Sequence, residues 1–172
     1  DLYAQPAPGF RLNILLPPGI LLTTGAPRIS TVMDMSNTPS PILSVIVPVK
    51  DEEVAVQAFV SRVSAVIEGL KDAAATSYEI LFVDDGSTDG TMAAIAAAHR
   101  DNPHVRAISL SRNFGKEAAL SAGLDHARGA AVVPMDVDLQ DPPEVLGEMI
   151  AKWRAGFDTV YGVRKDRATD SL

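Results

Sequence analysis

Cysteine is absent from this 172-residue chain, which excludes disulfides, thiolate metal sites and cysteine nucleophiles. No apolar run reaches the roughly 18 residues that a membrane-spanning helix needs, so none is predicted. Cationic side chains are also in the minority, with 15 Lys and Arg against 22 Asp and Glu and a net charge of −7. An acidic chain is a poor candidate for non-specific nucleic-acid binding. A phosphate ligand would therefore depend on a metal ion and a few local basic groups.

Several nucleotide-binding and catalytic motifs are missing as well. The sequence contains no G-x-G-x-x-G fingerprint and no Walker lysine, so neither a dinucleotide site nor a P-loop is indicated. Ser87 does not stand in a Gly-x-Ser-x-Gly elbow, so no serine-hydrolase triad is indicated. His99, His104 and His126 share no metal-ligand spacing, and we predict that they are surface or packing residues.

Residues 1–40 differ in composition from the rest of the chain. They contain no lysine and no sustained hydrophobic period, and a signal peptide would need a basic start and an unbroken apolar segment. We therefore predict an irregular leader or arm, or sequence added to the natural protein, before a domain over residues 41–172. The alternative is an arm that packs on a partner or a membrane surface. Six of the twelve prolines lie in this segment: Pro6, Pro8, Pro17, Pro18, Pro27 and Pro39.

Apolar runs and helical periods alternate from residue 42 onward. This alternation predicts an α/β fold whose sheet is mostly parallel and covered by helices on both faces. The predicted strands are Leu43–Val49, Tyr78–Val83, Val105–Leu110, Ala130–Met135 and Phe157–Val163. The predicted helices are Val56–Leu70, Thr91–His99, Glu117–Ala127 and Pro142–Ala155, the last with Met149 and Trp153 in the core.

A polar cluster follows every predicted strand. Sheets of this kind bind ligands at the carboxyl ends of their strands, so these clusters predict a single site on one rim. The clusters, in chain order, are Lys50, Asp51 and Glu52; Asp84 and Asp85; Arg112, Asn113 and Lys116; Asp136 and Asp138; and Arg164.

Asp136 and Asp138 form a D-x-D pair directly after a predicted strand. Two carboxylates at this spacing can converge on one hard cation, and Mg²⁺ or Mn²⁺ usually shares its oxygen ligands with substrate phosphates. Gln140 adds a neutral oxygen nearby. The alternative is a polar turn between strand and helix, in which Asp141 caps a helix that starts at Pro142.

Asp84 and Asp85 precede Gly86 and a run of hydroxyls. A turn with Ser87 or Thr88 as helix cap would explain this pattern, and it would still leave a carboxylate free to accept from a base N–H or ribose hydroxyls. Further along the chain, Arg112 and Lys116 are the best local cations for a diphosphate, although an exposed loop would explain them equally well.

Several of these segments resemble the family 2 glycosyltransferases of the GT-A fold, and the resemblance runs from about Leu43 to Ser171. Its motifs are PVKDEE at 48–53, VDDGSTDGT at 83–91 and MDVDLQDPPE at 135–144. Asp51 replaces the usual asparagine, and Lys50 stands where an aromatic residue is frequent. A narrower resemblance, to transferases that move a sugar onto dolichyl or undecaprenyl phosphate, rests on SRNFGKEAALSAG at 111–123 and YGVRKDR at 161–167.

The resemblance implies roles for individual residues. Asp136 and Asp138 would approach a Mg²⁺ or Mn²⁺ ion and the diphosphate, with Gln140 assisting. Asp85, beside Asp84, would recognise the base or the ribose. The nucleoside pocket would be lined by Pro48, Lys50 and Glu52, and the phosphates would contact Lys116 and Arg164, with Arg112 as a further local cation.

The implied reaction transfers a sugar from a UDP- or GDP-sugar to a polyprenyl phosphate with inversion at the anomeric carbon. Relatives of this branch carry an acceptor-side aspartate and membrane helices further on, so the catalytic residue is expected beyond Leu172. The full-length protein is expected at the cytoplasmic face of a membrane, whereas this chain by itself is expected to be soluble. A homo-oligomer is compatible with either expectation. Two alternatives stay open, namely a polysaccharide or protein acceptor and a non-catalytic nucleotide-binding fragment.

Overall fold

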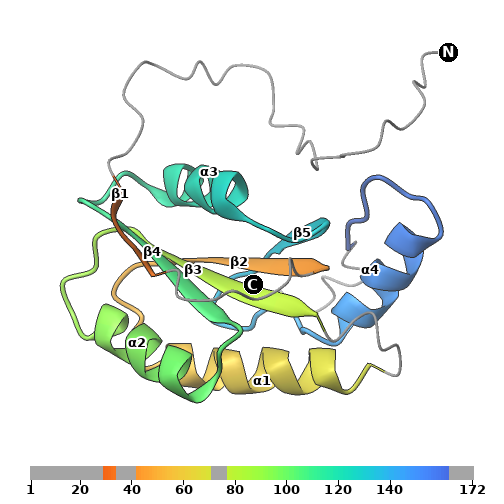
Figure 1. The fold of residues 1–172 in the computed structure, drawn as a ribbon, viewed down its shortest axis with the longest axis horizontal. Coiled ribbons are helices and arrows are strands. Elements are labelled where there is room, and N and C mark those ends of the chain that lie inside the picture. The colour runs from red at the N-terminus through yellow and green to blue at the C-terminus, as the bar shows by residue number, and fades with distance from the viewer. Residues whose placement is uncertain (1–28, 34–41, 71–76, 163–172) are drawn as a thin grey trace, which may run out of the picture.

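A computed structural model describes residues 29–33, 42–70 and 77–162 of the chain (Figure 1). Its sheet has five strands in the order β1-β4-β3-β2-β5, and every neighbouring pair except β1 with β4 is parallel. The strands are β1 (Ile29–Met33), β2 (Leu43–Val49), β3 (Tyr78–Asp84), β4 (Val105–Leu110) and β5 (Ala131–Pro134). The helices are α1 (Val56–Glu68), α2 (Thr91–Asp101), α3 (Lys116–His126) and α4 (Val145–Arg154).

Helices cover the sheet on both faces. Helix α3 lies on one face, and α1 and α2 lie side by side on the other (Figure 1). Every residue of β3 is buried, and all of β2 except Pro48 is buried too, as expected for central parallel strands. The predicted α/β architecture, with a mostly parallel sheet between helices, is confirmed.

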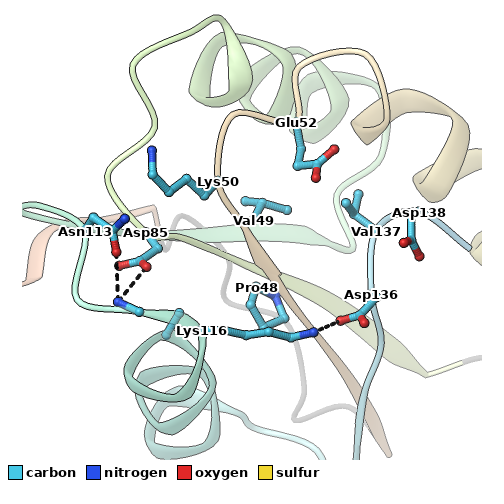
Figure 2. A pocket seen from close by; sticks show the side chains of 12 residues that line it. Pro48, Val49, Lys50, Glu52, Asp85, Asn113, Lys116, Asp136, Val137 and Asp138 are labelled. Atoms are coloured by element: carbon cyan, nitrogen blue, oxygen red, sulfur yellow. Dashed lines mark hydrogen bonds and ion pairs between the residues drawn. The ribbon is translucent and has the colours of Figure 1, made fainter.

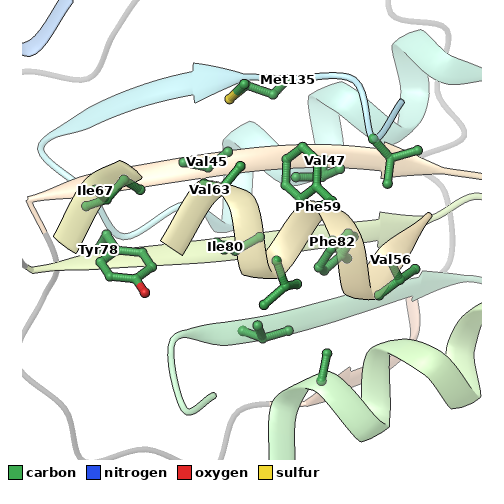
Figure 3. Close-up of a cluster of buried hydrophobic side chains, with 14 of the residues drawn as sticks. Val45, Val47, Val56, Phe59, Val63, Ile67, Tyr78, Ile80, Phe82 and Met135 are labelled. Carbon is green, nitrogen blue, oxygen red and sulfur yellow. The ribbon is translucent and has the colours of Figure 1, made fainter. Parts of the chain in front are cut away.

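The larger part of the core lies between the sheet and the apolar stripe of α1. Val56, Phe59, Val63 and Ile67 are fully buried and recur at helical spacing, which places them on one face (Figure 3). The Phe59 ring meets the Phe82 ring edge to face, with 5.9 Å between centroids. A second cluster of buried side chains lies under α3 on the opposite face: Ile46, Leu81, Val83, Ile108, Leu110, Ala119 and Ala122.

A buried ion pair joins the amino-terminal ends of the central strands. Glu79 and Arg106 are only 3% and 7% exposed and form a direct ion pair. The other Glu79 oxygen accepts from Ser44 Oγ at 2.5 Å and from the backbone N–H of Arg128 at 2.8 Å. Gly129 in turn approaches Ser44 so closely that a Cβ would lie 2.5 Å from its backbone nitrogen. Periodicity alone did not predict this cluster, whose members lie far apart in the sequence.

The structure differs from the sequence-based prediction in three places. Residues 29–33, within the segment predicted to be irregular, form β1 and pair antiparallel with β4; their β-branched residues suit an edge strand. No strand forms over 157–162, where Phe157 and Tyr161 are 60% and 78% exposed, and Val163 lies outside the described residues. Helix α4 begins at Val145 rather than Pro142, because the two prolines form a preceding turn.

No helix in the described ranges has the length and apolar character needed to cross a membrane.

Candidate functional site

A cavity of about 380 Å³ opens at the carboxyl ends of β2, β3 and β5 (Figure 2). Lys50, Asp85 and Asn113 lie at one end, Asp136 and Asp138 at the other, and the Lys116 side chain extends between them. Four carboxylates and two lysines therefore surround one space. The lining residues are Pro48, Val49, Lys50, Glu52, Asp85, Asn113, Gly115, Lys116, Ala119, Asp136, Val137 and Asp138.

The loop 50–53, which lines the cavity through Lys50 and Glu52, is joined by hydrogen bonds to the loop 87–91. The backbone N–H of Asp51 donates to Ser87 Oγ at 2.9 Å, and that of Glu52 donates to Thr91 Oγ1 at 2.8 Å. The N–H of Glu53 donates to Asp89 Oδ2 at 3.2 Å. The hydroxyls that follow Asp85 in the sequence therefore hold the loop after β2, and this leaves the Glu52 side chain at the cavity.

Asp51 organises this junction. Its φ of 55° lies in the left-handed region, which Asp and Asn tolerate better than most residues. Its carboxylate accepts from Thr88 N–H at 2.7 Å and from Lys50 Nζ at 2.5 Å. The Lys50 hydrogen bond, followed by that of Thr88, lowers the pKa of Asp51 from 3.8 to about 2. The same hydrogen bond raises the pKa of Lys50, so both groups are charged at neutral pH.

The adjacent carboxylates Asp84 and Asp85 have different surroundings. Asp84, 2% exposed, accepts from Ser87 N–H at 3.1 Å and Ser109 Oγ at 3.2 Å and does not line the cavity. Asp85, 4% exposed, lines the cavity and accepts from the backbone N–H groups of Phe114 and Gly115 at 2.7 and 2.8 Å. Asp85 therefore fixes the loop that precedes α3, and each of its oxygens has one further lone pair for a ligand.

Lys116 is the first residue of α3 and follows Gly115, whose φ of 98° favours glycine. A cation at a helix N-terminus opposes the helix dipole, so local helix stability does not explain this lysine. Its Nζ lies 2.6 Å from Asp136 Oδ1, with 65% of the lysine side chain and 52% of the aspartate side chain exposed. Lys116 therefore crosses the cavity to the acidic pair.

Asp136 and Asp138 lie on the loop after β5, separated by the buried Val137. Both carboxylates are exposed and line the cavity. One Asp138 oxygen accepts from the Gln140 N–H at 3.1 Å, and Leu139, between them, has a φ of 57°. The chain bends away from the cavity at Leu139, and the Gln140 side chain does not line the cavity.

The donor set fits a hard divalent cation shared with a phosphate ligand. Mg²⁺ and Mn²⁺ prefer carboxylate oxygens, and Mg²⁺ typically uses one or two carboxylates plus substrate phosphates and water. Asp136 and Asp138 supply two such carboxylates at the cavity. In the ranges that the structure describes, no group of three or more acidic or histidine side chains forms a complete cage. Phosphate oxygens would have to complete the coordination.

The cavity includes most, but not all, of the predicted site residues. Asp84 and Gln140 do not line it, and neither does Arg112, whose guanidinium lies over the Phe114 ring at 4.2 Å from its centroid. Arg164 lies outside the described residues. The residues brought together as predicted are Pro48, Lys50, Glu52, Asp85, Lys116, Asp136 and Asp138.

Some cavity residues were not assigned to the site from the sequence. Asn113 was noted at a strand end, and its Oδ1 accepts from Gly115 N–H at 2.9 Å. Three further lining residues have small or apolar side chains that suggest no role in ligand chemistry: Val49, Val137 and Ala119. Only their nearness in sequence to Pro48, Asp136 and Lys116 could have assigned them to the site.

Other residues singled out in the sequence have structural roles. Each histidine places Nδ1 against a backbone carbonyl, at 2.6 Å for His99, 3.0 Å for His104 and 2.9 Å for His126, so the predicted packing role is confirmed. Met149 and Trp153 are half-buried and line an apolar cavity beside β5 instead of entering the core.

The predicted capping residues of two helices are wrong. Asp141 precedes α4 by more than one residue and does not cap it, because Glu144 is the residue before the helix; Asp141 lines a smaller neighbouring cavity with Lys116 and Asp136. At α2, Gly90 is the N-cap and no side chain makes the cap hydrogen bond; Ser87 Oγ accepts from the Asp51 N–H instead, and the Thr91 N–H donates to Asp89 Oδ1 at 2.9 Å.

Known proteins match this chain over the described domain. The model of glycosyl transferase family 2 matches residues 44–171. A prophage bactoprenol glucosyl transferase homolog of Escherichia coli is 49% identical over 128 residues, which are 74% of this chain and 40% of the relative. An undecaprenyl-phosphate 4-deoxy-4-formamido-L-arabinose transferase of Aeromonas hydrophila is 37% identical over 77% of this chain and 40% of the relative. The chain thus spans about 40% of the length of these curated relatives.

Solved structures agree with this assignment. A mannosyltransferase of Pyrobaculum calidifontis, in complex with GDP-Man and Mn²⁺, superposes with a TM-score of 0.56 and 29% identity over 69% of this chain and 33% of its own. Glucosyl-3-phosphoglycerate synthase of Mycobacterium tuberculosis, with Mn²⁺ and UDP, gives a TM-score of 0.50 and 26% identity over 66% of this chain and 39% of its own. With its mostly parallel sheet between helices and a family match over residues 44–171, this chain belongs to the family 2 glycosyltransferases.

Proposed function

We propose that the protein transfers a sugar from a nucleotide-diphosphate donor to a polyprenyl phosphate, and that the 380 Å³ cavity is its donor site. The observation that carries this proposal is the arrangement of charges in the cavity: a buried carboxylate at one end, two exposed carboxylates at the other, and a lysine between them. The relatives named for bactoprenol and undecaprenyl phosphate support the acceptor class.

The nucleoside would lie at the end formed by Pro48, Lys50 and Asp85. Asp85 keeps its orientation because two backbone N–H groups hold it, and its remaining lone pairs can accept from a base N–H or a ribose hydroxyl. Asn113 lies at the same end, and Glu52 lines the cavity between that end and the acidic pair (Figure 2). We propose that these groups select the nucleotide, with UDP and GDP as the two candidates.

The diphosphate would lie between Lys116 and the acidic pair. Asp136 and Asp138 would hold a divalent ion, Mg²⁺ or Mn²⁺, which when bound supplies positive charge at the diphosphate. The Lys116 ammonium would donate to diphosphate oxygens as negative charge grows on the leaving group. Solved relatives in complex with Mn²⁺ support the use of a divalent metal.

The acceptor phosphate would attack the anomeric carbon from the face opposite the diphosphate, so a single displacement inverts the sugar. A phosphate monoester is already anionic at neutral pH, so a strong base is not required to make it nucleophilic. We expect the protein to act at the cytoplasmic face of a membrane, where such a lipid and a soluble nucleotide-sugar can meet.

Product analysis tests this proposal. The chain is incubated with Mn²⁺, radiolabelled UDP-glucose or GDP-mannose, and undecaprenyl phosphate, and the organic phase is analysed by mass spectrometry. A lipid-linked sugar phosphate whose formation requires the lipid phosphate would support the proposal. Transfer to an added polysaccharide or protein in place of the lipid would contradict the acceptor class. Metal-dependent nucleotide binding without any transfer would support a donor-binding fragment instead.

A further inference from the structure

The Lys116–Asp136 ion pair uses one of the two carboxylates available for a divalent ion. Lys116 Nζ lies 2.6 Å from Asp136 Oδ1, which is a full charge-assisted hydrogen bond. Asp136 and Asp138 are the two carboxylates at this end of the cavity (Figure 2). A cation that engages both carboxylates would come close to the ammonium group, and the repulsion between two positive charges at one carboxylate favours displacement of the ammonium.

The surroundings of Lys116 allow the ammonium to move. The lysine side chain is 65% exposed. Lys116 is the first residue of α3, and its backbone is held in place because the preceding Gly115 N–H donates to Asp85. The terminal ammonium can therefore turn within the cavity while its Cα stays in place. A diphosphate in the cavity would offer it new acceptors, and the released Asp136 could then bind the metal.

We propose that Lys116 exchanges partners on donor binding: it holds Asp136 in the ligand-free protein and passes to the donor diphosphate when a divalent ion takes the carboxylate. This inference rests on the proposed donor site. In this role Lys116 neutralises Asp136 and holds its carboxylate in place before the metal arrives. It also couples metal binding to nucleotide binding. The metal displaces Lys116 from Asp136, and the nucleotide diphosphate accepts the hydrogen bonds of the displaced ammonium.

The exchange predicts opposite effects of one substitution on two ligands. In Lys116→Met, Mn²⁺ alone should bind about two- to five-fold more tightly, the range that an exposed ion pair contributes. UDP or GDP in the presence of Mn²⁺ should bind at least about ten-fold more weakly, because a charged hydrogen bond to phosphate is lost. The free Mn²⁺ signal in electron paramagnetic resonance measures the first quantity, and calorimetric titration measures the second.

Two further variants separate exchange from a general charge effect. Lys50→Met removes a lysine from the same cavity, but its partner is Asp51 and not the acidic pair, so Mn²⁺ affinity should stay at the wild-type value. Lys116→Arg keeps the positive charge and should keep the weak Mn²⁺ affinity of the wild type. Thermal unfolding confirms that each variant is folded.

The outcomes are distinct. Tighter Mn²⁺ binding in Lys116→Met but not in Lys50→Met supports the exchange. Unchanged Mn²⁺ affinity with weaker nucleotide binding makes Lys116 a simple phosphate contact and overturns it, as does equal tightening in both variants. If the wild-type chain binds no Mn²⁺ even with UDP or GDP present, the proposed donor site itself fails, and the exchange fails with it.

Discussion

Two pairs of carboxylates follow strands of this sheet, and their surroundings differ. Asp84 and Asp85 are 2% and 4% exposed and together accept four hydrogen bonds, three from neighbouring loops and one from Ser109 in β4. Asp136 and Asp138 are exposed, and the contacts described for them are one ion pair and one bond within their own loop. The first pair stabilises the fold and offers a ligand only spare lone pairs, whereas the second is open to a cation.

Energetics explain why the difference matters. A buried carboxylate has lost its water and depends on protein donors, so removing it leaves those donors unsatisfied. An exposed carboxylate remains hydrated and contributes little to stability. Substitutions should therefore separate carboxylates that stabilise the fold from carboxylates that bind ligands, and the following tests run from the largest expected effect on stability to the smallest.

Glu79→Ala should give the largest loss. It would leave the Arg106 guanidinium buried without its counter-charge, next to an Nε that already has no hydrogen-bond partner. We expect the free energy of unfolding in urea to fall by roughly 3–5 kcal/mol. Glu148→Ala is the matched control, because this exposed glutamate pairs with Lys152 one helical turn away and should cost less than about 0.5 kcal/mol. Similar losses in both variants would contradict the distinction.

Asp85→Ala should have the next largest effect. The backbone N–H groups of Phe114 and Gly115 would lose their acceptor, which we expect to lower the free energy of unfolding by roughly 2 kcal/mol. Asp85→Asn retains one carbonyl oxygen and should recover part of that loss. If Asp85→Ala unfolds at the same urea concentration as the wild type, the carboxylate does not hold the loop before α3.

Asp51 connects stability to pH. Its folded-state pKa of about 2 is below the ordinary 3.8, so the ionised form favours the folded state. This contribution is present above about pH 4, and it is lost as the pH falls through 3.8 toward 2. In Asp51→Asn, which tolerates the same positive φ, unfolding curves should show a smaller stability loss over that pH range. Parallel pH profiles for the two proteins would contradict the assignment.

The double substitution Asp136→Asn with Asp138→Asn should leave stability nearly unchanged. Both side chains are exposed, so the free energy of unfolding should shift by less than about 0.5 kcal/mol. Thermal unfolding followed by circular dichroism measures this. A loss comparable to that of Asp85→Ala would mean that the acidic pair is structural, and the comparison of the two pairs would fail.

The sequence predicted the core strands well because apolar runs determine them. Strands β2 and β4 have the predicted bounds, and β3 and β5 agree within one residue at each end. The polar clusters at the carboxyl ends of the strands were predicted for the same reason, because the chain leaves each buried strand through a polar loop. Edge elements were predicted poorly: β1 depends on pairing with β4, and residues 157–162 carry apolar side chains without becoming a strand.

The roles of individual site residues were harder to predict. Asp84 and Asp85 are adjacent in sequence, but the strand ends between them and only the second reaches the cavity. Arg112 is long enough to turn back onto Phe114, so its position in sequence did not determine where its charge lies. The Lys116–Asp136 contact joins α3 to the loop after β5, and contacts between distant segments become visible only in the fold.

Calorimetric titration of the chain with UDP and GDP, with and without Mn²⁺, tests the central claim most directly, with the Asp136→Asn, Asp138→Asn variant measured in parallel. We predict that one of the two nucleotides binds, that binding requires Mn²⁺, and that the variant loses this binding while remaining folded. Absence of binding to either nucleotide, or equal binding by the variant, would contradict the assignment of the cavity as a metal-dependent donor site.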